Sequence, residues 1–429
     1  MKDVASALPP LGQIASALRD ITESLACEFR VPSSEPPLWG DFEWRIAQAV
    51  ASMHGISSLL CTDLRWEGPP SWRSFLEEQR EHTAGRHRKI VQLLDGIDSQ
   101  ARHEEIAFVA LKGAALHKNG IYQIGERPMA DVDLLVRGAD ANNMAGLLGR
   151  CGFECTFTTW RHHVFESRAR NLPVGFGEHI DNPIRIELHT SIRDFLPVSE
   201  IDITQLVFPG AACAGLNDYP SVAALMMHLL LHAAGNMRAH ALRYIQLHDI
   251  ARLAARFVRS DWEALLSARP NGQPLWWAVP PLLLTGRYFP AAIPAFVTAR
   301  LGLECPWWLG TIARRQLLTD VSWSNIHAQA LPGIEWSRTP LDALRFITGR
   351  IWPSPEARWE LKHFAASHPG ASEVPWYGIS QAARILRWIF FNPPRVQTLL
   401  SVRAAFAPCP GEHNPSAALE RFRSDRPTA

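Results

Sequence analysis

The spacing of apolar residues divides the 429-residue chain into three stretches, and the first of them is helical. In residues 41–60 the apolar side chains recur at intervals of three and four, and Asp41 stands where a helix cap is expected. A second long helix is expected from Ser71 to about Leu94, separated from the first by the Pro- and Gly-containing segment 67–70. The first hundred residues are therefore predicted to be helical.

From about residue 104 the apolar runs become short, which is typical of buried strands. Brief helices are expected between them, at 114–122 and at 141–150 with Asp140 as the cap. The predicted strands are IAFVALKG ending at Gly113, DVDLLV (131–136), FECTFTT (153–159), HHVFES (162–167) and IRIELHT (184–190). Such a mixture predicts a compact sheet with helices packed on it.

After about residue 215 the strand signals vanish, and the segments around 221–236 and 240–257 are strongly helical. The fold class is thus predicted to be α+β, with a small mixed β-sheet core embedded in a mostly helical chain. We expect a helical N-terminal region (1–100), the sheet core (101–212), a helical C-terminal region (213–408) and a flexible tail (409–429).

The charge balance narrows the class of partner. Lys plus Arg number 43 and Asp plus Glu 42, giving a net charge of +1. The chain thus lacks the basic excess of proteins that bind nucleic acid or a membrane surface, so nucleic acid is an unlikely partner and no membrane is expected. The most apolar stretch, 222–234, is interrupted by His228 and His232 and is too short to span a bilayer. With no signal peptide and no cysteine spacing typical of a zinc site, we expect a cytoplasmic protein with reduced thiols.

The sequence ADVDLLV carries the strongest chemical signal. Residues two apart on a strand face the same side, so Asp131 and Asp133 project together while Val132 and Leu134 point into the core. Two carboxylates at this spacing repel each other unless a cation lies between them, and Mg²⁺ is the divalent ion that prefers such oxygen ligands. An acidic pair on a solvated strand face is the plainer alternative.

Two further segments flank this pair. Upstream, Gly113 follows a buried strand and precedes a helix, where backbone N–H groups can cradle a phosphate and Lys112 can add a positive charge. An ordinary left-handed turn is the alternative there. Downstream, RIELH places Glu187 on a polar strand face, where it can supply a third carboxylate, and His189 is more typically a hydrogen-bonded neighbour than a ligand.

The order of these elements resembles the nucleotidyltransferase superfamily of polymerase beta-like enzymes. The residues LKGAALH, GERPMADVDLLV and IELH, within 106–190, look more specifically like the uncharacterised bacterial family NTP_transf_5. The resemblance implies that Asp131, Asp133 and Glu187 are the catalytic metal ligands and that Gly113 belongs to the triphosphate loop. Ala114 departs from the superfamily pattern, in which Ser commonly follows the glycine, and Lys112 is expected to replace the missing hydroxyl contact.

Several other polar residues remain with two interpretations. Arg127 is expected to contact phosphate through its planar guanidinium, or else to be a surface turn residue. His162 and the adjacent His163 face opposite sides of a strand, which is poor metal geometry. His228 and His232 share one helix face, and they either line a cleft or belong to the core. Arg243 and Asp249 are six residues apart, so they are not expected to pair with each other. One or both of them can reach the cleft.

Three functions follow from the sequence. The first is Mg²⁺-dependent transfer of a nucleoside monophosphate from a nucleoside triphosphate to a hydroxyl of an unidentified acceptor, a small molecule or a peptide. The second is transfer of a nucleotide-activated sugar, with the same acidic pair holding a metal on the diphosphate. The third is a nucleotide-binding module without turnover, suggested by Ala114 and the large helical half.

Overall fold

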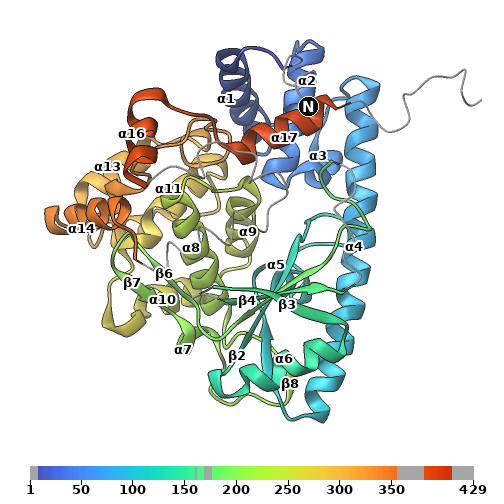
Figure 1. Cartoon of the computed structure of the whole chain (residues 1–429), viewed down its shortest axis with the longest axis vertical. Coiled ribbons are helices and arrows are strands. Elements are labelled where there is room, and N and C mark those ends of the chain that lie inside the picture. The colour runs from blue at the N-terminus through green and yellow to red at the C-terminus, as the bar shows by residue number, and fades with distance from the viewer. Residues whose placement is uncertain (1–7, 160–161, 169–175, 355–380, 408–429) are drawn as a thin grey trace, which may run out of the picture.

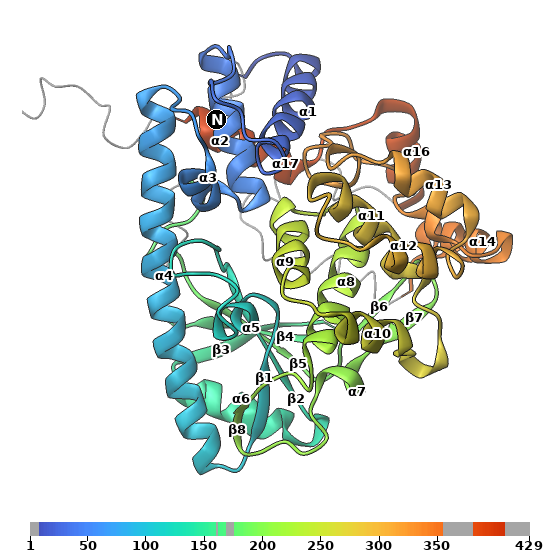
Figure 2. The same cartoon turned by 180° about the vertical axis from the view of Figure 1, so that it is seen from behind.

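The computed structural model describes residues 8–159, 162–168, 176–354 and 381–407. The tail predicted at 409–429 lies outside the described residues. Within them the chain is α+β, as predicted, with a six-stranded mixed sheet among many helices (Figures 1 and 2).

The N-terminal quarter is helical, as predicted, but its boundaries differ. The single helix expected at 41–60 is two helices, because Gly55 takes a left-handed conformation (φ 66°) that ends the first. The helix expected to end near Leu94 continues to His103, because Ile97 and Ala101 go on packing against the sheet. The four helices are α1 (Leu11–Glu28), α2 (Asp41–His54), α3 (Ser57–Asp63) and α4 (Pro70–His103).

The main sheet has the strand order β3-β4-β5-β2-β1-β8. Strands β5 and β2 pair in parallel, as do β1 and β8, and the other neighbours are antiparallel. The five strands expected from the sequence are all present, while β8 and the separate hairpin β6–β7 were missed because each has only three residues. The strands are β1 (Ala107–Ala110), β2 (Asp131–Val136), β3 (Phe153–Thr158), β4 (His162–Ser167), β5 (Arg185–His189), β6 (Arg193–Phe195), β7 (Glu200–Asp202) and β8 (Gly215–Asn217).

The two faces of the sheet belong to two separate cores. Val132 and Leu134 of β2 pack with α4 and α6 on one face, whereas Leu135 belongs to the larger core of the helical body. The alternation expected from ADVDLLV is therefore confirmed, and it places Asp131 and Asp133 on the same face as Leu135. Figure 2 shows α8 and α9 beside the sheet, where they can complete a site with these side chains.

The remaining helices build the body around the sheet. Helix α8 is buried on nearly all sides, and the side chain of Ser221 caps it by accepting a hydrogen bond from the Ala224 N–H (3.1 Å). The last helix, α17, returns to pack on α2 (Figure 1). These helices are α5 (Lys112–Lys118), α6 (Ala141–Arg150), α7 (Thr204–Val207), α8 (Val222–Arg238), α9 (Tyr244–Ala254), α10 (Arg259–Ser267), α11 (Val279–Tyr288), α12 (Ala295–Gly302), α13 (Trp307–Arg315), α14 (Pro340–Ile351), α16 (Gln381–Phe391) and α17 (Val396–Phe406).

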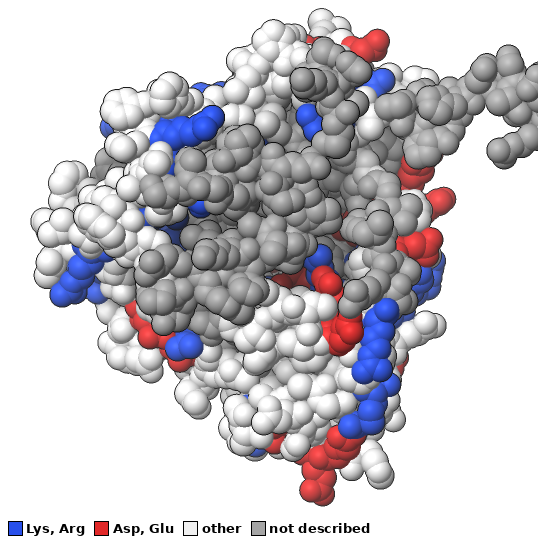
Figure 3. Space-filling view, viewed as in Figure 1, with Lys and Arg blue, Asp and Glu red and all other residues white. Residues whose placement is uncertain are grey.

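The described surface carries both signs of charge. On the face shown in Figure 3, acidic and basic side chains are intermingled, in keeping with the net charge of +1. Across the described segments, no helix is at once long and apolar enough to cross a membrane.

Candidate active site

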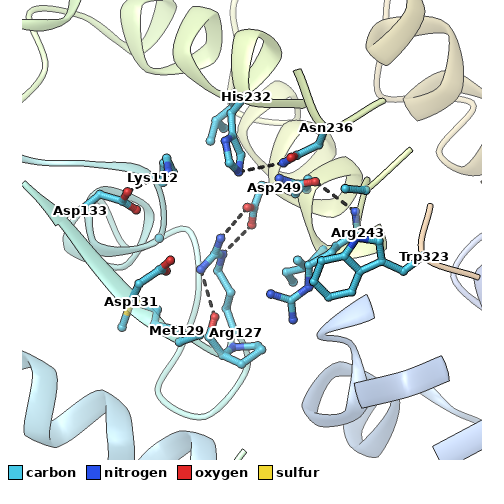
Figure 4. A pocket seen from close by; sticks show the side chains of 17 residues that line it. Lys112, Arg127, Met129, Asp131, Asp133, His232, Asn236, Arg243, Asp249 and Trp323 are labelled. Atoms are coloured by element: carbon cyan, nitrogen blue, oxygen red, sulfur yellow. Dashed lines mark hydrogen bonds and ion pairs between the residues drawn. The ribbon is translucent and has the colours of Figure 1, made fainter. Parts of the chain in front are cut away.

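A cavity of about 230 Å³ lies where β2 and the start of α5 face helices α8 and α9 (Figure 4). Its walls combine charged side chains from both halves of the chain. The sheet side contributes Lys112, Gly113, Arg127, Asp131 and Asp133, and the helices contribute His232, Asn236, Arg243 and Asp249. Five of the six residues predicted for the site thus line this cavity together with residues that the sequence left without an assigned role, and Glu187 is the one that does not line it.

Three carboxylates meet at the sheet edge of the cavity. Asp131 and Asp133 lie two residues apart on β2, and Glu187 on β5 is in register with Asp133. Asp133 is buried, whereas Asp131 is exposed to the cavity and receives no hydrogen bond or ion pair from any described residue. Partial desolvation, followed by repulsion from Asp133 and Glu187, raises the pKa of Asp131 to about 6.

Lys112 supplies the positive charge within this group. Its backbone is left-handed (φ 46°), and its Nζ donates a 2.8 Å hydrogen bond to Asp133 Oδ1. His189 Nε2 lies 3.1 Å from the same oxygen. Burial alone would raise the pKa of Asp133, but Lys112 and His189 outweigh it and hold this pKa well below its usual range. Asp133 therefore stays ionised while the charge on Asp131 is only partly compensated.

Arg127 is part of a buried ion pair, so the surface-turn interpretation is wrong. Its Nε and Nη2 donate to the two carboxylate oxygens of Asp249 at 2.7 and 2.8 Å, and Nη1 donates to Pro128 O. The phosphate contact expected for Arg127 stays a prediction. All three nitrogens of its guanidinium already donate hydrogen bonds within the protein. Asp249 pairs with Arg127 from the other half of the chain, a long-range contact that no local sequence pattern predicts.

Gly113 is required by the close approach of this guanidinium. It lies buried in the first turn of α5, and a Cβ atom there would fall 2.3 Å from Arg127 Nη1. The left-handed residue of the turn is Lys112 and not the glycine, so the simple glycine-turn interpretation is also wrong. The missing side chain lets Arg127 pack against the start of α5.

Two tyrosines hold the walls of the cavity together. Tyr122 donates to Asp249 Oδ1 (2.8 Å) and contacts His248 Nδ1 (2.8 Å). Tyr219 accepts from the Lys112 N–H (3.4 Å) and lies 2.7 Å from His228 Nδ1. Burial lowers the pKa of His228 to about 3, so His228 is a neutral, buried partner that fixes the Lys112 turn.

Arg243 lines both the first cavity and a second, adjoining one of about 500 Å³. Its Nε donates to Met53 O (2.9 Å), and no described residue forms an ion pair with its guanidinium. Pro128, Ala130 and Trp323 also line both cavities. The second cavity extends between α2, α3, α4 and α17 and is lined by hydroxyls such as Ser52, Ser57 and Ser401.

Two histidines lie close to Glu187. Strands β4 and β5 place His162 directly opposite His189, and both Nε2 atoms lie 3.6 Å from Glu187 Oε2. His163 points to the other face, where its Nδ1 lies 3.1 Å from Thr158 Oγ1. His163 is the neighbour of His162 in the sequence, whereas His189 becomes its neighbour only through the pairing of β4 with β5. The pattern of one strand therefore could not predict this partner.

The sequence profile of one family matches more than half of the chain. The family is described as uncharacterised nucleotidyltransferase, and the match covers residues 40–272, which include the whole sheet and helices α2 to α10. No curated protein and no solved structure matched the sequence.

Proposed function

The chain belongs to this family of nucleotidyltransferases, and from that premise we propose that it transfers a nucleoside monophosphate from a nucleoside triphosphate to a hydroxyl acceptor. One observation carries the proposal: Asp131, Asp133 and Lys112 line one cavity, and Glu187, in register with Asp133, is close enough to act on the same lysine electrostatically. Negative charge concentrated in this way suits a site that binds phosphate through cations.

The donor set fits a divalent metal ion. The pKa of Asp131 is raised by desolvation first and then by repulsion from Asp133 and Glu187, and a bound cation would relieve that repulsion. Asp131, Asp133 and Glu187 would hold Mg²⁺ through hard oxygen ligands. When bound, the ion supplies charge neutralisation at the phosphate oxygens.

The residues of the chain contribute positioning and charge. Lys112 keeps Asp133 ionised and adds a cation beside the phosphates, and Gly113 leaves room for Arg127 at the same wall. In the proposed reaction the acceptor oxygen bonds to the α-phosphorus while the bond to the β-phosphate oxygen breaks and pyrophosphate leaves. The hydroxyl proton passes to a carboxylate, for which Glu187 at the rim is our candidate.

The two adjoining cavities suggest which part of the site binds each substrate. The smaller cavity contains the acidic cluster and suits the phosphates, while the larger one beyond Arg243 offers serine hydroxyls to a polar organic group. We therefore place the acceptor, a small molecule or a peptide, on the side of α2, α3 and α17. The mixed surface charge supports neither a membrane nor a nucleic-acid acceptor.

The test is Mg²⁺-dependent release of pyrophosphate from each nucleoside triphosphate, with hydroxyl-bearing small molecules and peptides as acceptors. Asp131→Asn and Asp133→Asn are expected to abolish it, whereas the exposed Asp95→Asn on α4 is the matched control and should retain it. Full activity in the Asp131→Asn, Asp133→Asn double variant would refute the proposal. Transfer from sugar nucleotides alone, or nucleotide binding without turnover, would favour one of the other two functions.

A further inference from the structure

We propose that His162, Glu187 and His189 form a binding site for a divalent transition-metal ion of the zinc class. One ligand atom from each residue lies within 4.8 Å of the other two. The proposal shares Glu187 with the proposed nucleotidyl transfer, but it does not depend on that reaction.

The strand register builds this triad. His162 of β4 and His189 of β5 are directly opposite each other, and their ring centroids are 4.9 Å apart. Glu187 is two residues from His189 on the same strand, so its side chain projects to the same face. The three groups therefore converge from two hydrogen-bonded strands, which is a rigid support for a metal site.

The distances suit ligands of one ion better than hydrogen bonds. Both Nε2 atoms are 3.6 Å from Glu187 Oε2, which is too long for a hydrogen bond. Two ligands of a tetrahedral ion with bonds of about 2.1 Å lie about 3.4 Å apart. An ion at the centre of the triad would thus need only small side-chain adjustments.

His162 lacks the hydrogen bonds that a half-buried imidazole normally makes. Its Nδ1 is buried without a partner among the described residues, and its Nε2 points toward Glu187 at the longer distance. Nε2 likewise receives no hydrogen bond from a described residue, so it is the ring nitrogen available to an ion shared with Glu187. His189 Nε2 would exchange its 3.1 Å contact with Asp133 for the ion.

The chemical class follows from the donors. Two imidazole nitrogens and one carboxylate favour Zn²⁺ or its analogue Co²⁺, whereas Mg²⁺ and Mn²⁺ prefer oxygen ligands. The side chains of the triad are between 10% and 23% exposed, which leaves an ion access from solvent.

Co²⁺ is the probe, because its visible absorption reports on its ligands. We expect the full-length protein to bind Co²⁺ with visible absorption bands, and His162→Gln to weaken the affinity at least about tenfold. His163→Gln is the matched control, since that histidine faces the other side, and it should bind Co²⁺ like the wild type. Absence of the bands in the wild type, or unchanged affinity in folded His162→Gln, would overturn the proposal.

Two additional measurements keep the result decisive. If His162→Gln does not fold, pulsed EPR of the wild type with one equivalent of Cu²⁺ decides, because Cu²⁺ prefers imidazole to the carboxylates of β2. Coupling to imidazole nitrogen supports the site, and its absence contradicts it. Asp131→Asn should lose pyrophosphate release yet keep the Co²⁺ spectrum. Failure of the wild type to release pyrophosphate would count against the proposed function alone and leave the Co²⁺ result intact.

Discussion

The Nζ atom of Lys112 lies 2.8 Å from Oδ1 of Asp133. This ion pair links the turn between β1 and α5 to strand β2. The Asp133 side chain is only 4% exposed and that of Lys112 17%. Without the ammonium group, a buried carboxylate would lose its main compensating charge. The pair therefore ties the stability of the turn to the charge of the site.

Replacing this lysine is expected to cost more stability than replacing its neighbour on the same helix. Lys112→Met should lower the free energy of unfolding by about 3–5 kcal/mol, the usual cost of breaking a buried pair. Lys118→Met removes an exposed pair with Asp218 and should cost at most about 1 kcal/mol. Urea unfolding of both variants measures the difference, and similar losses would show that the Lys112 pair is not effectively buried.

Local patterns predicted the elements of the site well. The alternation in ADVDLLV placed Asp131 and Asp133 on one face, because a strand allows only two directions for its side chains. The same alternation in RIELH predicted that Glu187 lies on a polar strand face. Short apolar runs likewise predicted the five longer strands of the sheet.

Contacts between distant segments were beyond such reasoning. Arg127 and Asp249 are 122 residues apart, and only the tertiary fold brings α9 next to the loop that precedes β2. The pairing of His162 with His189 depends on the register of β4 and β5, which no periodicity in a single strand specifies. The need for Gly113 similarly arises from the position of Arg127 and not from the backbone conformation of the glycine.

The raised pKa of Asp131 predicts how stability varies with pH. Its ordinary value is about 3.9, and in the fold it is about 6, so between these values the folded state binds more protons than the unfolded state. This carboxylate therefore destabilises the metal-free protein increasingly as pH rises through that window, and fully above it. Asp131→Asn should raise the melting temperature at pH 8, with a difference that shrinks toward pH 4.

Differential scanning fluorimetry without and with Mg²⁺ checks this expectation. Mg²⁺ should stabilise the wild type and narrow its gap to Asp131→Asn, because a bound cation relieves the same repulsion. The exposed Asp95→Asn should show neither effect. A lower melting temperature for Asp131→Asn at pH 8 would contradict the repulsion argument.

Gly113→Ala is expected to destabilise the protein through Arg127. The new Cβ would lie 2.3 Å from Nη1 and 3.0 Å from Cζ of a guanidinium fixed by two hydrogen bonds to Asp249. Such overpacking typically costs about 1–3 kcal/mol. The substitution should cost less in an Arg127→Ala background, and urea unfolding of the double-mutant cycle measures this coupling.

Gly96→Ala is the matched control for that substitution. Gly96 lies in α4 with nothing within 4 Å of an added Cβ, so alanine there should stabilise the helix by about 0.5–1 kcal/mol. Equal losses for Gly113→Ala with and without Arg127 would show that the clash is not with the guanidinium.

Arg243→Met tests whether a substrate contacts the side chain that lines both cavities. Arg243 has no ion-pair partner among the described residues, and a charged hydrogen bond to a substrate contributes about 1.5–3 kcal/mol, so kcat/KM should fall about 10- to 100-fold. Arg252→Met on the same helix removes a more exposed guanidinium and should leave kcat/KM nearly unchanged. Calorimetric titration with the nucleoside triphosphate assigns the contact: weaker nucleotide binding places Arg243 on the phosphates, and unchanged binding with slower transfer places it on the acceptor. A folded Arg243→Met variant with wild-type nucleotide binding and turnover would show that neither substrate contacts Arg243.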